Sequence, residues 1–306
     1  MDWAKAKNIL IVVFLTLNIF LLAYGSMHRP QNVNSNEGVV SVLEILQKRG
    51  ITISEDYELP KYNKRTPMLI MENYVINRKD VLSFLFGKNE DFDLIKAIDK
   101  SLEDDKIKSY ADGSKHIEFT GVGSFVYVDE DATIKIEEFN IEKDSLQDKQ
   151  IIKGFRKLFL NMNIDVSSFI LDRVKTNDDG SYTFVFVENY KNYLVFDNRA
   201  KITVFNSGIK AIDFSISKID GFSKSSSPIM PAHLVLLKNF YTLANSEQND
   251  AGIIICSIDI GFKGFDDKID ENTPNTESTV QSPSWRVISK DGREMYFKAY
   301  DGEEIK

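Results

Sequence analysis

The chain has 306 residues, enough for two ordinary domains or one large one, and its formal net charge at pH 7 is −8. No basic stripe interrupts this acidic balance, so nucleic acid is not an expected partner. The only cysteine, Cys256, excludes an intramolecular disulfide, and apolar burial must therefore hold the fold together.

The first predicted element is a transmembrane helix over residues 8–25. Residues 8–28 contain no Asp, Glu, Lys or Arg. A helix over residues 8–25 rises roughly 27 Å, close to the ~30 Å thickness of the hydrocarbon core. Lys5 and Lys7 precede it and only Arg29 closely follows. This bias favours a cytoplasmic N-terminus at residues 1–7 and an extracytoplasmic body tethered to the cell membrane.

Residues at both ends of this helix are expected to anchor it. Lysine stems extend along the apolar surface while their charges stay in water, and amphipathic aromatic rings prefer the membrane interface. The four anchoring candidates are Trp3, Lys5, Lys7 and Tyr24.

One stripe of the helix is a candidate contact with another transmembrane helix. Phe14, Asn18, Leu22 and Gly25 share a face at helical spacing. The Asn18 amide is costly in hydrocarbon unless it finds a hydrogen-bond partner, and Gly25 permits close approach of a second helix. Asn18 could instead bond to the backbone carbonyl four residues before it, and both interpretations stay open.

A cleaved signal peptide is the alternative to a retained anchor. Ala23, Tyr24 and Gly25 form a small-x-small processing site. The apolar run is longer than the ~7 to 15 residues typical of a signal-peptide core. The length therefore favours a helix that stays in the membrane.

A polar stalk at residues 26–37 leads to a first α+β sub-domain at residues 38–143. Val39, Leu43 and Leu46 recur at helical spacing and Gly50 follows them, which predicts a helix ending near Arg49. The other elements expected here are strands at 51–53, 68–75, 107–110, 116–120 and 124–128, and a short helix at 81–85 closed by Gly87.

A second α+β sub-domain is predicted at residues 144–306. Its first helix carries one apolar stripe, and period-two alternation follows near Phe184 and Phe214. The elements expected here are a helix at 151–162, antiparallel strands around 182–186 and 212–216, turns at 179–180 and 206–208, a helix opened by Pro231 with Leu237, Phe240, Tyr241 and Ala244 facing inward, a strand at 253–262, and a closing hairpin at 285–300.

The acidic stretch at 266–284 is almost free of large apolar residues and is expected to be a mobile loop. The fold class predicted for the body is α+β, with two sub-domains that each pack helices against an antiparallel sheet.

No motif for catalysis, metal binding or cofactor binding emerges. The three histidines lack metal-ligand spacing, and Gly121–Gly123 is better explained as a turn than as a phosphate loop. The acidic clusters at 103–105, 129–131 and 266–267 lack the calcium-loop pattern and are expected to be solvated loop charge. Cys256 lies in a strand-like segment and is expected to be a buried structural thiol.

Three stretches resemble the YycI (WalI) family. Residues 1–9, Met-Asp-Trp-Ala-Lys-Ala-Lys-Asn-Ile, run into the hydrophobic segment as the family's N-terminus does. Residues 231–237 leading to 255–262 are similar to its late helix and the following strand, and residues 284–302 are similar to its closing hairpin. Ala4, where a small hydroxyl residue is common, and the acidic stretch depart from the family pattern.

The resemblance implies a non-enzymatic accessory regulator of the essential YycG (WalK) sensor histidine kinase of low-GC Gram-positive bacteria, a two-component system of cell-wall homeostasis. It implies a short cytoplasmic N-terminus, one transmembrane helix and an external α+β body shaped like part of its companion YycH. The implied partners are the kinase, a YycH-like protein and the lipid bilayer. No cofactor is implied.

Two other classes of function remain open. One is an anchored binding or protease-inhibitor-like module that acts through the final hairpin, and a protein lacking the residues before Gln31 would then keep full activity. The other is a cell-wall hydrolase, which requires carboxylates brought together by the fold in a concave acidic pocket.

Overall fold

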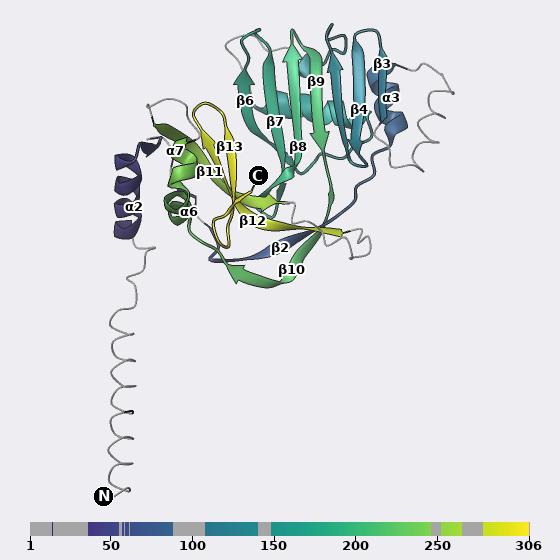
Figure 1. Ribbon diagram of the computed structural model, residues 1–306. Helices are drawn as coiled ribbons and strands as arrows, with labels where there is room; N and C mark the ends of the chain where they lie inside the picture. The colour runs from purple at the N-terminus through teal and green to yellow at the C-terminus, as the bar shows by residue number, and fades with distance from the viewer. Residues whose placement is uncertain are drawn as a thin grey trace, which may run out of the picture.

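The computed structural model describes residues 14, 36–54, 57, 59, 60, 62–87, 108–139, 148–245, 252–264 and 278–305. Within these residues the protein is a mixed α+β structure in which 14 strands pair into one large sheet and few helices cover it (Figure 1). No helix among them is long and apolar enough to cross a bilayer. The predicted transmembrane helix lies outside the described residues except for Phe14, which is helical.

Seven strands form the upper part of the sheet in the order β6-β7-β8-β9-β5-β4-β3, all antiparallel (Figure 1). Helices α3 and α5 and the short helix η2 pack on one face. The elements are α3 (Arg78–Phe86), β3 (Lys108–Asp112), β4 (Lys115–Gly121), β5 (Ser124–Asp129), η2 (Glu137–Phe139), α5 (Asp148–Asn161), β6 (Phe169–Thr176), β7 (Tyr182–Tyr190), β8 (Tyr193–Phe205) and β9 (Gly208–Ser215).

Period-two burial along these strands builds the first core. Phe184 and Phe186 of β7 are fully buried, and the Phe155 ring of α5 stacks on Phe186 with centroids 3.8 Å apart. Burying such side chains contributes roughly 1.5 to 3 kcal/mol each. Residues from both sides of positions 143 and 144 share this core, since Phe125 and Phe214 lie in it with Phe155.

A second core lies around the fully buried Trp285, whose Nε1 donates to the Met230 carbonyl oxygen at 2.9 Å. Helices and strands near both ends of the described chain enclose it. They are α2 (Asn36–Lys48), β1 (Ile51–Ile53), α6 (Ala232–Lys238), α7 (Phe240–Asn245), β11 (Ile253–Lys263), β12 (Ser278–Ser289), β13 (Glu294–Lys298) and β14 (Glu304–Ile305).

We call the third part of the sheet the lower ribbon. It consists of β10 (Lys218–Pro228), β2 (Arg65–Glu72) and residues 278–281 of β12, paired in that order. A small apolar cluster of Leu69, Met71, Val195 and Phe262 joins its inner face to β8 and β11. In Figure 1 the ribbon runs below the upper sheet.

Most predicted elements are confirmed with small shifts at their ends. The helix before Gly50, the helix closed by Gly87, the strand at 51–53 and the closing hairpin occur as expected. Gly50 and Gly87 both have positive φ, which glycine adopts without a Cβ penalty at the end of a helix. Strands β6, β8 and β10 carry no clear sequence signal and were not predicted as separate strands.

The sheet differs from the expected antiparallel sheets in two places. Both β1 and β8 pair with β11 in parallel, and the β8 pairing spans only Leu194 opposite Gly261 and Val195 opposite Phe262. Such a pairing joins segments far apart in the chain, so local alternation gives no sign of it.

The predicted loop at 266–284 is wrong at its C-terminal end, because residues 278–284 belong to β12. Gln281, Ser282 and Ser284 are buried although they are polar. Backbone pairing with β2 and then with β11 places them there, so the hydrophobic pattern does not reveal the strand. Residues 265–277 lie outside the described part of the chain.

Two predicted buried side chains are in fact exposed. Tyr241 is 66% exposed, and it lies in the second of the two short helices, α6 and α7, into which Asn239 divides the segment after Pro231. Cys256 is exposed because the alternation of β11 places it on the same face as the exposed Ile254.

Gly261→Ala tests the short parallel junction between β8 and β11. A Cβ on Gly261 would lie 2.3 Å from the Leu194 carbonyl oxygen and 2.7 Å from the Phe196 ring, so the strands must move apart. Overpacking of this kind costs about 1 to 3 kcal/mol. We expect a clearly lower thermal midpoint than for Cys256→Ala at an exposed site of the same strand, and equal midpoints for the two variants would contradict the role of Gly261.

Candidate functional site

The polar side chains of the described residues form no reactive centre that can be recognised from their grouping. Among these residues there is no cluster of three or more His, Cys, Asp or Glu side chains that could hold a metal ion. Asp129, predicted as solvated loop charge, is instead fully buried. Its carboxylate accepts hydrogen bonds from the Thr133 hydroxyl at 2.7 Å and the Thr133 amide at 2.8 Å. These bonds shape the turn after β5.

The pKa of Asp129 follows from this environment. Burial alone would raise it, but the hydrogen bonds from Thr133, Ser114 and the Asp131 amide stabilise the ionised form and lower the pKa below its ordinary value. The clusters at 103–105 and 266–267 lie outside the described residues.

A cluster of charged side chains is centred on Arg286 of β12, whose side chain is only 4% exposed. Its guanidinium forms two hydrogen bonds with Asp172 of β6, at 2.8 and 2.6 Å, and a third with Asp259 of β11 at 2.9 Å. The guanidinium also lies 5.0 Å from the centroid of the Phe196 ring. We call these residues the junction cluster, because Asp172 belongs to the upper sheet and Asp259 to the second core.

A second ion pair extends the junction cluster. Arg173, next to Asp172 on β6, pairs with Glu294 of β13, and the Tyr296 hydroxyl donates to the same carboxylate. Burial would raise the pKa of Glu294, but the bonds from Tyr296 and Arg173 outweigh it and lower the pKa to about 2. Burial and the adjacent Glu294 charge raise the pKa of Tyr296.

Burial would also lower the pKa of Arg286, yet its bonds and charge interaction with Asp172 and Asp259 raise it above the ordinary value. Arg286 and Glu294 therefore stay ionised across the physiological range. The hydrogen-bond donors of the cluster are directed at carboxylates within the cluster. The cluster therefore connects two parts of the body and does not resemble a reactive centre.

Sequence reasoning missed the junction cluster. Asp172 and Arg286 are 114 positions apart, and a charged residue in a strand is ordinarily assigned to the solvent face. One signal was available. Asp259 and Arg286 lie directly opposite each other on β11 and β12, and pairing these two predicted strands would have juxtaposed opposite charges.

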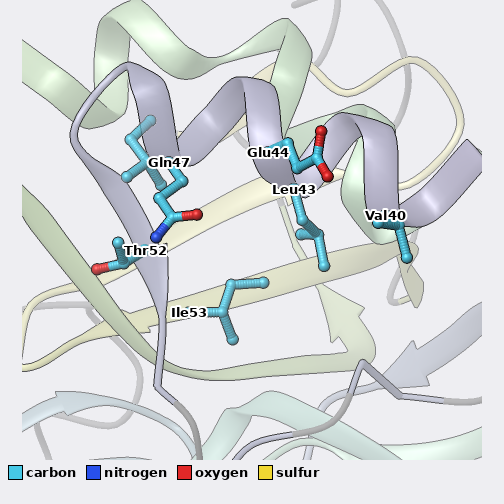
Figure 2. A pocket seen from close by; sticks show the side chains of 7 residues that line it. Val40, Leu43, Glu44, Gln47, Thr52 and Ile53 are labelled. Carbon is cyan, nitrogen blue, oxygen red and sulfur yellow. The ribbon is translucent and has the colours of Figure 1, made fainter.

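A groove lies between α2 and β1 on the surface of the second core (Figure 2). Its volume is about 250 Å³. Figure 2 shows Leu43 of α2 directed toward Ile53 of β1. Val40, at the rim, is 54% exposed. The full lining comprises Val40, Leu43, Glu44, Gln47, Ile51, Thr52 and Ile53. An apolar hollow of this kind suits a partner side chain better than a polar substrate.

The predicted transmembrane contact residues are mostly outside this description. In this isolated chain Phe14 is helical and its side chain is 67% exposed. The other contact and anchoring candidates, Asn18, Leu22, Gly25, Trp3, Lys5, Lys7 and Tyr24, lie outside the described residues.

Comparison with models of protein families shows to which family the chain belongs. The family model described as YycI protein matches residues 30–300. The chain belongs to the YycI family. The resemblance seen in the sequence is thereby confirmed over most of the chain. Family membership indicates a regulatory accessory role in the WalK/YycG two-component system, and the family is not known for enzymatic activity.

The other comparisons add little. No curated protein matches the chain. Among solved structures, an uncharacterized protein from Eubacterium rectale is similar, with a TM-score of 0.44 and 13% sequence identity over 90% of this chain and 99% of that chain.

Asp172→Ala tests the junction cluster. It leaves the buried Arg286 with one carboxylate fewer, and breaking a buried pair in this way costs roughly 3 to 5 kcal/mol. Lys210→Ala is the control, because it removes a surface ion pair with Asp179, 2.7 Å between the charged atoms, and solvent screens such a pair. Chemical denaturation measures both, and similar midpoints would show that the junction cluster holds nothing together.

The depressed pKa of Glu294 predicts a pH dependence. Because its folded pKa is lower than its unfolded pKa, its ion pair stabilises the protein above the ordinary pKa of about 4.5, and this contribution is lost as pH falls toward 2. The loss amounts to at most about 3 kcal/mol. Glu294→Gln should reduce the slope of unfolding free energy against pH in this window, whereas Gln at the exposed Glu137 should leave it unchanged.

Proposed function

We propose that this chain is a single-pass, membrane-anchored regulator of an essential cell-envelope sensor histidine kinase of the WalK/YycG kind. Residues 1–7 lie in the cytoplasm, residues 8–25 span the membrane, residues 26–37 form a stalk and the body is extracytoplasmic. The single observation that carries the proposal is the family match over residues 30–300. The uncharged run at residues 8–28 supports the anchor.

The proposed mechanism has two contacts. In the bilayer, the stripe of Phe14, Asn18, Leu22 and Gly25 packs against a helix of the kinase or of a companion protein. Outside the cell, the body forms a complex with a YycH-like partner. The exposed apolar rim of the α2–β1 groove at Val40 is a candidate contact with that partner.

Helix α2 is suited to connect the two contacts. It begins at Asn36, shortly after the proposed stalk, and its Val42 and Leu46 are buried in the second core. A displacement of the body therefore reaches the stalk through α2. The junction cluster limits how far the upper sheet can move relative to that core.

The alternative of an anchored binding or inhibitor-like module is less well supported. That module would act through the final hairpin, but its largest side chains, Trp285 and Phe297, are fully buried. They pack in the second core and are not available to a ligand.

Asn18→Leu in the full chain tests the intramembrane contact. Co-expression with the kinase and purification through a tag on the kinase should recover several-fold less of this variant, since an interhelical amide bond in membranes contributes about 1 kcal/mol. Thr16→Leu, on the opposite side of the helix, is the matched control and should co-purify normally. Undiminished association after replacement of residues 8–25 by an unrelated span would refute the intramembrane contact.

A further inference from the structure

We propose that the lower ribbon docks on an anionic membrane surface and so fixes the orientation of the body above the bilayer. This inference rests on the proposed anchor and adds a second, reversible contact with lipid headgroups. Three observations carry it: the charge of the ribbon, an uncovered apolar strip on its outer face, and its position relative to the start of α2.

The ribbon is basic although the whole chain carries −8. The ribbon, the residue before β2 and the adjoining turn between β7 and β8 together contain two carboxylates, Glu72 and Asp220. Against these stand five cations, Lys64, Arg65, Lys191, Lys218 and Lys224. All five cations are exposed.

Most of this positive charge is not neutralised locally. Lys218 pairs with Glu72 at 2.7 Å. The other four have no carboxylate at ion-pair distance within the part of the chain that the structure describes. Arg65 donates to the Ser226 carbonyl oxygen at 2.5 Å, and the Lys191 ammonium lies 5.2 Å from the Phe222 ring centroid. These contacts place Arg65 beside the C-terminal end of β10 and Lys191 beside the middle of the same strand.

The outer face of the ribbon carries apolar side chains that none of the described elements covers. Val280, 50% exposed, lies opposite Ile70, and Gly221 lies opposite Ile70 on the other side. The next outward side chain of β2, Met68, is also exposed. A Cβ on Gly221 would meet open space, so nothing on β10 shields Ile70. Exposed apolar groups bordered by cations are the composition that favours the membrane interface.

The position of the lower ribbon in the fold favours a lipid surface as its binding partner. Figure 1 places the ribbon and the N-terminal end of α2, where the chain arrives from the proposed anchor, on the same side of the body. Each cation near an anionic surface contributes about 1 kcal/mol, and the attraction decays over roughly 8 Å at physiological salt. An acidic body is repelled by such a surface unless this side faces it.

The consequence is a regulatory one. A docked ribbon holds α2 at one height and angle above the bilayer, whereas an undocked body turns freely on its stalk. The anionic lipid content of the membrane thereby influences the height and angle at which α2 and the body are presented to the kinase complex.

The test uses the full chain in nanodiscs of phosphatidylcholine alone or of an equimolar mixture with phosphatidylglycerol. A Cys256→Ser background carries one fluorophore at Ser225→Cys on β10, or at Ser109→Cys on β3 as a distant reference. Nitroxide-labelled headgroups quench a fluorophore that touches them. We expect strong quenching at position 225 in the anionic discs, weak quenching there in neutral discs, and weak quenching at position 109 in both.

Charge reversal gives the decisive comparison. Lys64→Glu, Arg65→Glu and Lys224→Glu together should weaken the docking equilibrium by at least roughly tenfold and return quenching to the neutral-lipid value. The matched control reverses the exposed Lys149, Lys175 and Lys290, which lie off the ribbon, and should leave quenching unchanged. Thermal melting confirms that both triple variants fold.

The outcomes separate this inference from the proposed function. A chain that alkaline carbonate extracts from the discs has no anchor, and both proposals then fail. A chain that is retained but shows no quenching at position 225, or equal quenching in both lipids, overturns the docking inference alone. A ribbon that binds an acidic protein instead of lipid gives that second result.

Discussion

The arrangement of the body depends on one buried cation. Arg286 is shared between Asp172 of the upper sheet and Asp259 of the second core. Among the described residues, the apolar contacts beside this cation include the small cluster around Val195 and Phe262 and the ring contact of Phe196 with Tyr296. A guanidinium provides planar, directional bonds that a methylene contact does not. The angle between the two parts is therefore set by bond geometry, whereas each part is held internally by its own apolar core.

This division explains why the protein suits a regulatory role. Two apolar cores joined by directional polar bonds resist displacement relative to each other, which a transmitting element requires. Family membership indicates the accessory role beside the sensor kinase. The groove between α2 and β1 and the lower ribbon are the surfaces that we propose for contact with a partner and with a membrane.

The sequence predicted local structure well and long-range structure poorly, for identifiable reasons. The helix that ends before Gly50 and the hairpin around Gly292 were predicted because apolar spacing and positive-φ glycines act locally. The start of β12 was missed because Gln281, Ser282 and Ser284 are buried by backbone pairing and not by apolar character. Asp172 and Arg286 were missed because only the folded sheet brings them together. Asn18 and its neighbours remain a prediction from the sequence.

The last strand of the lower ribbon has a consequence for proteins crowded in the plane of a membrane. Within the part of the chain that the structure describes, β10 pairs on one edge only, and an open edge is a template on which further chains can add strand by strand. Two register irregularities, at Gly221 and before Ser226, and Pro228 at its end interrupt that template. The cations of β10 repel a second copy approaching in the same orientation. The irregular edge thus protects the protein against aggregation.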